Sequence, residues 1–377
     1  MKRALVLSYF ALCVIALALA QQQQPQAKAP RKQAPAVSPD VQADGHVTFR
    51  LRAPNATSVA LHGEWTADTI PMAKDESGVW SATVGPLPRE VYAYSFTVDG
   101  VGIADPQNSQ VKLAAHGAAQ SLVAIPGDPP RLHDPRDVPH GTIQENWYYS
   151  KPLNHELRHF YVYAPPGYDA RSAAGYPVLF LLHGAGNSET NWESIGRANF
   201  IIDNLLAEKQ VKPMLLVMPF GHAVPQNGPD QARNNALFEE DLMTSILPAL
   251  ETNYRVASGA RNHAIAGLSM GGMQALAIGL HNPDRFAWIG VYSPIMESDF
   301  DTRYTEQLAA ADTLNKKLAL LWIGCGTEDN LFRGAKALDE TLNQRGVKHE
   351  FHPSEGGRHT WVLWREYLER MAPVLFR

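Results

Sequence analysis

The segment that most constrains the fold of this chain is Gly267-Leu268-Ser269-Met270-Gly271-Gly272. It follows the apolar run 264–266 and precedes a helical pattern over 270–281. A serine on such a tight strand-to-helix turn needs small residues two positions before and two after it, because the backbone there passes close to its neighbours. The pattern therefore predicts a nucleophilic serine, Ser269, exposed where a buried strand ends.

Apolar runs alternate with helical patterns over the second half of the chain. Continuous runs that end at or near glycine or proline cover 178–182, 214–218, 264–266 and 318–323. Helical patterns fall near 195–209, 237–254, 270–281, 333–345 and 360–371. Uninterrupted apolar strands that alternate with helices are typical of a doubly wound parallel sheet. The sequence therefore predicts an α/β domain over 141–377, with ligands bound at the carboxyl ends of its strands.

The region before this domain has the pattern of an all-β module. Apolar and polar side chains alternate over 47–52, 58–62, 79–84 and 92–98, and turn signals separate these runs. Such short strands are typical of an immunoglobulin-like β-sandwich, which we place at 41–126, followed by a proline-rich linker at 127–140. Its aromatic residues are expected to fill the core rather than to form a sugar platform. They are Trp65, Trp80, Tyr92, Tyr94 and Phe96.

The N-terminus has the pattern of an export signal. Lys2 and Arg3 precede an apolar run that ends in Ala-Leu-Ala at 18–20. The run is short for a membrane span, so we predict a signal peptide over 1–20 and a mature protein, periplasmic or secreted, without a membrane anchor. The Gln-, Pro- and Ala-rich stretch 21–40 is predicted to be a flexible tether. Cleavage would leave one cysteine, Cys325, which is expected to be a packing residue.

The charge balance excludes one class of function. The chain has 33 Lys and Arg against 38 Asp and Glu, a net charge of -5, and its basic residues are scattered. Proteins that bind nucleic acid carry a basic patch or stripe, so no nucleic-acid partner is expected. A single cysteine in the mature chain cannot supply a paired-cysteine zinc site. No metal or organic cofactor is expected.

A serine hydroxyl becomes a good nucleophile only beside a base. On a sheet of this kind, an acid and then a histidine follow the serine along the chain. His359, in a glycine loop before the last helical pattern, is the predicted base, and His352 is the reserve. Asp329 and Glu328 both follow the 318–323 run, and their positions alone do not separate them.

Two backbone N–H groups are expected to stabilise the oxyanion. One belongs to Met270, directly after the serine, and the other to Ala185, in a glycine-flanked loop after the 178–182 run. His183, at the start of that loop, is expected to be structural. Candidate pocket residues lie next to strand-end loops, although surface or core packing explains each of them equally well. They are Trp192, Asn187, His222, Asn330 and Trp361.

Short motifs along the α/β region carry a resemblance to a known family. They are Leu181-Leu182-His183-Gly184, Asn191-Trp192, Met218-Pro219-Phe220-Gly221, Phe238-Glu239-Glu240-Asp241-Leu242, Asn253-Tyr254-Arg255-Val256, the glycine-flanked serine segment, Gly326-Thr327-Glu328-Asp329 and Gly356-Gly357-Arg358-His359. Over about 140–377 the chain is similar to the esterase D-like family of feruloyl, acetyl-xylan and enterochelin esterases and mycolyltransferases. The resemblance implies an α/β-hydrolase fold and a triad of Ser269, Asp329 and His359, and so favours Asp329 over Glu328.

The all-β region carries a second resemblance. Its motifs are 47–56, Gly63-Glu64-Trp65, Gly78-Val79-Trp80 and Tyr94-Ser95-Phe96-Thr97-Val98-Asp99-Gly100. They resemble the immunoglobulin-like module at the front of glycogen branching enzymes, where the module can bind α-glucan. Similar modules also precede esterases.

These observations lead to one expected function and two alternatives. We expect a secreted serine carboxylic-ester hydrolase that removes feruloyl or acetyl esters from plant polysaccharide such as xylan. Its partner would be an ester-bearing carbohydrate or another small ester. One alternative is an enterochelin-type siderophore esterase, against which the export signal counts. The other is a carbohydrate-binding protein with a vestigial hydrolase domain, against which the intact triad counts. The oligomeric state is not predicted.

Overall fold

The computed structural model describes residues 37–296 and 300–377. The predicted signal peptide and most of the predicted tether lie outside the described residues. The last residues of that tether are an exception, because Ser38 is buried and Asp40–Val41 forms strand β1. The sandwich therefore begins earlier than the sequence suggested. Residues 37–377 form one unit by their contacts.

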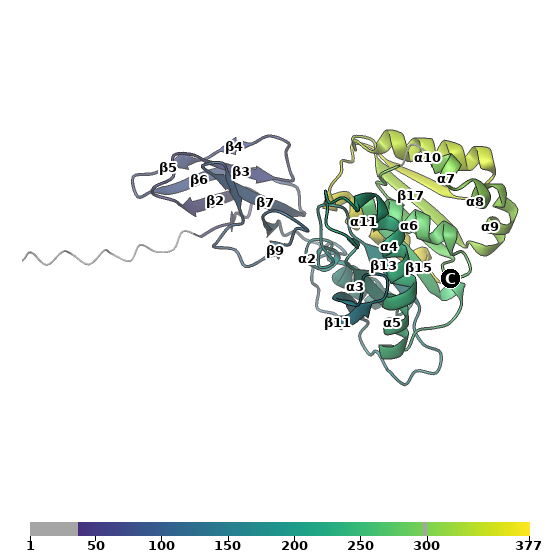
Figure 1. The fold of residues 1–377 in the computed structure, drawn as a ribbon. Coiled ribbons are helices and arrows are strands. Elements are labelled where there is room, and N and C mark those ends of the chain that lie inside the picture. The colour runs from purple at the N-terminus through teal and green to yellow at the C-terminus, as the bar shows by residue number, and fades with distance from the viewer. Residues whose placement is uncertain (1–36, 297–299) are drawn as a thin grey trace, which may run out of the picture. The chain divides into compact units, whose positions relative to one another are not determined.

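The first part of this unit is an all-β sandwich (Figure 1). One sheet has the order β1-β2-β6-β5, and the other has the order β4-β3-β7-β10-β9, with β8 paired to β7. The strands after β1 are β2 (Val47–Arg52), β3 (Val59–Gly63), β4 (Ile70–Pro71), β5 (Ala73–Lys74), β6 (Val79–Val84), β7 (Val91–Val98), β8 (Val101–Ile103), β9 (Val111–Lys112) and β10 (Gln120–Ala124).

The aromatic residues of the sandwich fill its core, as predicted. Trp80, Tyr92, Tyr94 and Phe96 are all buried. Trp65 is partly buried and packs into the same cluster, where it stacks on Phe49 with ring centroids 5.4 Å apart.

The second part contains an eight-stranded sheet of order β11-β12-β14-β13-β15-β16-β17-β18. The strands from β14 to β18 in this order run parallel, whereas β11 and β12 form an antiparallel hairpin on one edge. Their bounds are β11 (Thr142–Ser150), β12 (Glu156–Ala164), β13 (Val178–Leu182), β14 (Leu215–Pro219), β15 (His263–Leu268), β16 (Trp288–Tyr292), β17 (Leu320–Gly326) and β18 (Glu350–Ser354). The predicted α/β-hydrolase fold class is confirmed.

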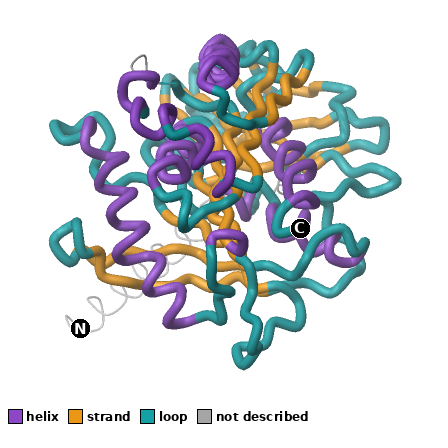
Figure 2. Tube along the Cα trace, turned by 90° about the vertical axis from the view of Figure 1, so that its right-hand side faces the viewer, coloured by secondary structure: helices purple, strands orange, loops and turns teal. Residues whose placement is uncertain are grey.

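Helices lie on both sides of this sheet (Figure 2). On one side are α4 (Asn234–Asp241), the π-helical η3 (Leu242–Ile246), α5 (Leu247–Asn253), α6 (Met270–His281), α7 (Phe300–Arg303), α8 (Thr305–Ala309), α9 (Ala311–Lys317) and α10 (Phe332–Arg345). On the other side are α2 (Asn191–Ser194), α3 (Ala198–Ala207) and α11 (Trp361–Met371). Short 3-10 helices are η2 (Gln231–Arg233), η4 (Ala260–Asn262) and η5 (Ala372–Val374).

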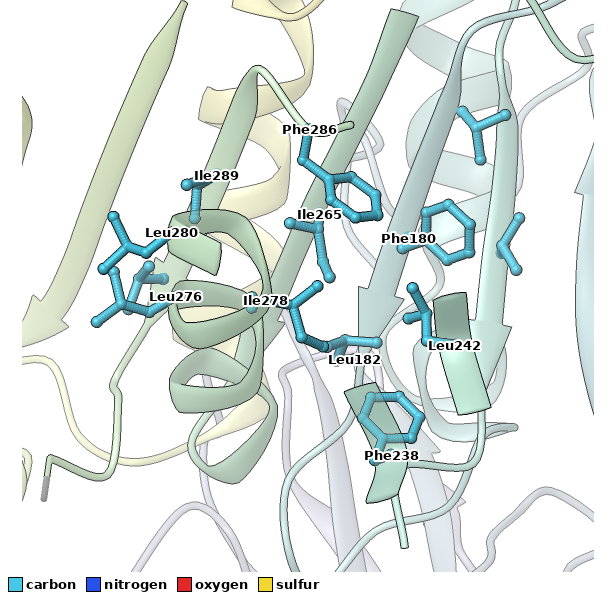
Figure 3. Close-up of a cluster of buried hydrophobic side chains, with 14 of the residues drawn as sticks. Phe180, Leu182, Phe238, Leu242, Ile265, Leu276, Ile278, Leu280, Phe286 and Ile289 are labelled. Carbon is cyan, nitrogen blue, oxygen red and sulfur yellow. The ribbon is translucent and has the colours of Figure 1, made fainter. Parts of the chain in front are cut away.

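Each face of the sheet has its own apolar core. Figure 3 shows part of the core under α6, where Phe180 and Ile265 of the sheet meet Ile278 of that helix. Every one of these side chains is almost fully buried, and burying one stabilises the fold by about 1.5–3 kcal/mol. The two cores fix the sheet and therefore the loops at its carboxyl edge. Among the described residues, no helix has both the length and the apolar character to cross a membrane.

Candidate active site

Ser269 lies on the sharp turn between β15 and α6. Its φ of 56° and ψ of -117° form a strained conformation that L-residues rarely adopt. The turn is held by the Ser269 N–H, which donates to Tyr292 O at 2.8 Å. A Cβ on Gly267 would collide with Gly271 O, and one on Gly271 would lie 2.5 Å from His183 O. Close packing therefore requires glycine on both sides of the serine.

Asp329 and His359 form a hydrogen-bonded pair. The His359 Nδ1 atom lies 2.8 Å from Asp329 Oδ2, and the Leu331 N–H donates to Asp329 Oδ1 at 2.9 Å. Burial by itself raises the pKa of Asp329, but the hydrogen bonds from His359 and Leu331 outweigh it and lower that pKa. An ionised Asp329 holds the proton of His359 on Nδ1. Glu328, the other candidate acid, is exposed.

Backbone hydrogen bonds tie the loop that carries the acid to the loop that carries the histidine. The Thr327 N–H donates to Ser354 O, and the Glu328 N–H donates to Gly357 O, both at 2.9 Å. The Gly356 N–H donates to Thr327 Oγ1 at 2.9 Å. These bonds fix the position of His359, although it lies in a loop.

Ser293 and Trp364 join the two sides of the site. The Trp364 indole N–H donates to Ser293 Oγ at 3.1 Å, and the Trp364 ring packs edge-on to His359 with centroids 4.8 Å apart. Ser293 is fully buried, and its hydrogen bond to Asp329 helps to lower the pKa of that carboxyl. The residue before Ser293 accepts the backbone N–H of Ser269. In the described residues no hydrogen bond joins Ser269 Oγ directly to His359, a bond that apo enzymes often lack.

Two backbone amides near the serine have no acceptor among the described residues, namely those of Met270 and Ala185. Met270 is the first residue of α6, where N–H groups lack helical partners and the helix dipole is positive. Gly184 O accepts hydrogen bonds from His183 Nδ1 at 2.8 Å and from the Asn187 N–H at 3.0 Å. Because the Gly184–Ala185 peptide is trans, the Ala185 N–H points away from those donors. Both amides could therefore bind an oxyanion.

Two buried histidines hold the loop that contains Ala185. The Gly221 N–H donates to His183 Nε2 at 2.9 Å, so the proton of His183 sits on Nδ1. Burial lowers the pKa of His183 to about 3, and both of its ring nitrogens are engaged by backbone groups, so neither is free to take the serine proton. His222 Nε2 lies 2.9 Å from Ala185 O, and burial lowers the pKa of His222 as well. Both rings position the loop.

Two of the five candidate pocket residues are core residues. Trp192 and Trp361 are 0% and 1% exposed and pack edge to face with ring centroids 5.2 Å apart. The Trp192 indole N–H is satisfied by Leu182 O at 3.0 Å. Their assignment as substrate contacts is wrong, because neither ring reaches an open surface.

The other three candidates lie around the strand ends. Asn187 is buried beside Gly184, which in turn packs against Ser269. His222 lines a cavity of about 480 Å³, and the exposed Asn330 lines a second cavity of about 490 Å³. Contact of these three residues with substrate stays a prediction.

The sequence did not reveal several residues around these two cavities. The cavity at His222 also contains Arg158, from β12, and His116, from the sandwich. Arg158 is buried and donates to Phe220 O and His222 O at 3.1 and 2.9 Å. The second cavity starts beside the serine, because the Ile295 N–H donates to Ser269 O at 3.3 Å. No short motif marks any of these positions.

Two other potentially reactive side chains, those of His352 and Cys325, pack against other parts of the protein. His352, the reserve base, stacks on Trp322 with ring centroids 4.6 Å apart. Cys325 is fully buried, and burial raises the pKa of its thiol to about 12, which is consistent with a packing role. Among the described residues, no cluster of three or more His, Cys, Asp or Glu side chains is arranged to hold a metal ion.

The fold and the turn at Ser269 define an α/β-hydrolase. The Putative esterase family matches residues 150–375, and the Carbohydrate-binding module 48 (Isoamylase N-terminal domain) matches residues 36–115. This chain belongs to that esterase family.

Individual relatives agree with this assignment. An endo-1,4-beta-xylanase/feruloyl esterase of Xylanibacter ruminicola is 32% identical over 90% of this chain, which spans 46% of that relative. A ferulic acid esterase from Anaeromyces mucronatus is 26% identical with a TM-score of 0.57, over 64% of this chain and 93% of that one. An enterobactin esterase from Shigella flexneri shares the fold, with 20% identity and a TM-score of 0.65 over 86% of this chain and 92% of that one.

Proposed function

We propose that this protein is an exported serine esterase that removes feruloyl or acetyl groups from plant polysaccharide such as xylan, with Ser269, Asp329 and His359 as its catalytic triad. The observation that carries the proposal is the Asp329–His359 hydrogen bond of 2.8 Å at the strand edge where the strained Ser269 lies. The xylanase/feruloyl esterase and the ferulic acid esterase support a feruloyl ester as substrate. The signal pattern at 1–20 supports export.

In the proposed reaction, Ser269 Oγ attacks the carbonyl carbon of the ester. His359 takes the hydroxyl proton on Nε2, the ring nitrogen that Asp329 leaves unoccupied. The carbonyl oxygen becomes an oxyanion that accepts hydrogen bonds from the Met270 and Ala185 N–H groups. One such donor lowers the barrier by about 3–4 kcal/mol.

The intermediate then collapses. The bond from carbon to the alcohol oxygen breaks, and His359 returns its proton to the leaving alcohol, which here would be a sugar hydroxyl. A water molecule next attacks the acyl-serine, with His359 again taking the proton. The bond between the acyl carbon and Ser269 Oγ then breaks and His359 returns its proton to Oγ, so the carboxylic acid leaves and the Ser269 hydroxyl is restored.

A substrate panel tests this proposal. Methyl ferulate, acetylated xylan and enterochelin are each incubated with the mature protein and with the Ser269→Ala variant. We expect ferulate or acetate release that the variant lacks. Hydrolysis of enterochelin alone would move the assignment to a siderophore esterase. Equal release by both proteins would remove Ser269 from the reaction.

A further inference from the structure

The hairpin of β11 and β12 carries an exposed aromatic strip, which we define as Trp147, Tyr149, Leu157 and His159. Trp147 is 56% exposed and Tyr149 is 64% exposed, and among the described residues they are the two large aromatic side chains that are strongly exposed. Trp147 pairs with His159 across the hairpin, and Tyr149 pairs with Leu157. Directly paired residues share a face of the sheet, so the four side chains form one continuous surface.

Strand register places this strip at the edge of the sheet where Ser269 lies. Phe160 pairs with Pro219, the last residue of β14, so the part of β12 before Phe160 extends past the end of that strand. The neighbouring parallel strands end at the same level, where Leu182 pairs with Gly267, two residues before Ser269. The strip therefore lies beyond the carboxyl ends of the parallel strands.

Side-chain contacts continue from the strip toward the loop that contains Ala185. The Trp147 and His159 ring centroids are 4.8 Å apart, and His159 Nε2 lies 2.8 Å from Glu189 Oε1. Glu189 lies two residues after Asn187, whose backbone N–H donates to Gly184 O and so holds the loop that contains Ala185. A chain molecule that occupies the candidate active site would therefore find the strip along its path.

The strip has the chemistry to bind a sugar chain. The faces of sugar rings are apolar and can lie flat on tryptophan or tyrosine, whose polar atoms remain at the rim. Carboxylates beside those rings accept hydrogen bonds from sugar hydroxyls. Glu145 lies 3.8 Å and Glu189 2.8 Å from the His159 ring, so both acids border the strip.

The more exposed of these acids, Glu145, disfavours a second copy of this chain as the occupant. Self-association would bring its carboxylate, on a side chain that is 39% exposed, from each of two copies toward one surface and remove it from water, which is costly for like charges. A neutral polysaccharide brings hydroxyl donors and no charge, so it complements the acids.

We propose that the aromatic strip binds the sugar backbone of the ester-bearing polysaccharide and so directs the polymer to Ser269. This inference rests on the proposed function, because it assumes that the ester belongs to a polymer. It assigns polymer recognition to the hydrolase sheet itself.

Binding is tested without catalysis. The Ser269→Ala protein and the same protein with Trp147→Ala and Tyr149→Ala are run in affinity electrophoresis against arabinoxylan from which all esters have been removed. We expect the triple variant to bind about tenfold more weakly, the loss typical of removing aromatic anchor residues. Val101→Ala, which truncates an exposed apolar residue of the sandwich, is the matched control and should bind normally. Equal binding by the triple variant, or no binding by either protein, would overturn the proposal.

Two further measurements, of catalysis and of molecular mass in solution, complete the test of this proposal. With Ser269 intact, Trp147→Ala/Tyr149→Ala should lower kcat/KM on feruloylated arabinoxylan by about tenfold and leave hydrolysis of methyl ferulate unchanged. If the parent protein releases no acid from any ester, the proposed function fails. The affinity electrophoresis would still show whether the aromatic strip binds the polysaccharide. A change from dimer to monomer caused by the two substitutions would overturn the proposal in favour of a contact between copies.

Discussion

His359 Nδ1 lies 2.8 Å from Asp329 Oδ2, whereas the neighbouring Glu328 is exposed and contributes its backbone N–H to Gly357 O. Two adjacent acids thus have different tasks. Asp329 faces inward and orients the imidazole, and the Glu328 backbone fixes the loop from which that imidazole extends.

Asp329→Asn should lower kcat by about 10⁴-fold, because an amide at this position favours the wrong tautomer of His359. The matched variant Glu328→Gln changes the same charge on an exposed side chain and keeps the backbone hydrogen bond. Release of p-nitrophenol from p-nitrophenyl acetate measures both. Equal losses in the two variants would remove Asp329 from its proposed role.

Two glycines of one loop form a second matched pair. A Cβ on Gly184 would lie 2.8 Å from Leu268 Cδ1 and 3.2 Å from Ser269 Cβ, whereas a Cβ on Gly186 would meet nothing within 4 Å. Gly184→Ala should therefore push the Ala185 N–H out of place and reduce kcat by about 10²-fold, the cost of one lost oxyanion donor. Gly186→Ala should stay close to the parent enzyme. If Gly186→Ala lost more activity than Gly184→Ala, the Ala185 N–H would not be a donor to the oxyanion.

A buried ion pair joins the sandwich to the last helix. Arg365, fully buried on α11, donates to Glu90 Oε1 at 2.8 Å and to Val91 O at 2.9 Å. Glu90→Gln leaves the guanidinium buried without a counter-charge, so we expect a loss of about 3–5 kcal/mol in the free energy of unfolding, measured with urea. On the surface of the same helix, Glu366 pairs with Arg370 at 3.5 Å, and Glu366→Gln should cost less than about 1 kcal/mol.

The same cluster predicts how stability depends on pH. His133 Nε2 lies 2.9 Å from Glu90 and its Nδ1 lies 3.0 Å from Glu369; these acids raise the pKa of His133, even though burial and Arg365 oppose them. A raised pKa means that the contribution is complete below about 6.5, the pKa in the unfolded chain, and is lost as pH rises through the folded value. The melting temperature should therefore fall as the pH rises above about 6.5, and His133→Gln should flatten that fall. If the melting temperature of the His133→Gln variant depended on pH as that of the parent protein does, His133 would not be the group responsible.

At acid pH the dependence of stability on pH has the opposite sign, because stability is lost as the pH falls. Burial raises the pKa of Glu90, but His133, Arg365 and Arg131 together lower it to about 2. The stabilisation from Glu90 is therefore present above its ordinary value of 4.5 and is lost as pH falls toward 2. Glu90→Gln should remove this acid dependence.

The sequence predicted two kinds of strand, the fully buried ones and the alternating ones such as 47–52, which became β2. The run 178–182 became β13, and the glycines around Ser269 marked its turn. The β11–β12 hairpin escaped prediction because β11 has neither a continuous apolar run nor a strict alternation of apolar and polar residues, and its Trp147 and Tyr149 are exposed. Sequence position likewise could not separate a core tryptophan such as Trp192 from a pocket residue, since only packing decides which way a ring at a strand end turns.

Covalent phosphorylation of Ser269 by a fluorophosphate tests the central claim most directly. The mature protein is treated with diisopropyl fluorophosphate, whose phosphorus is attacked by the serine oxygen with loss of fluoride to give a tetrahedral adduct, and its intact mass and digest are measured. The account predicts one adduct per chain, located on Ser269, absent from Ser269→Ala and much slower to form in Asp329→Asn. An unmodified Ser269 in a folded protein that still hydrolyses p-nitrophenyl acetate would contradict it.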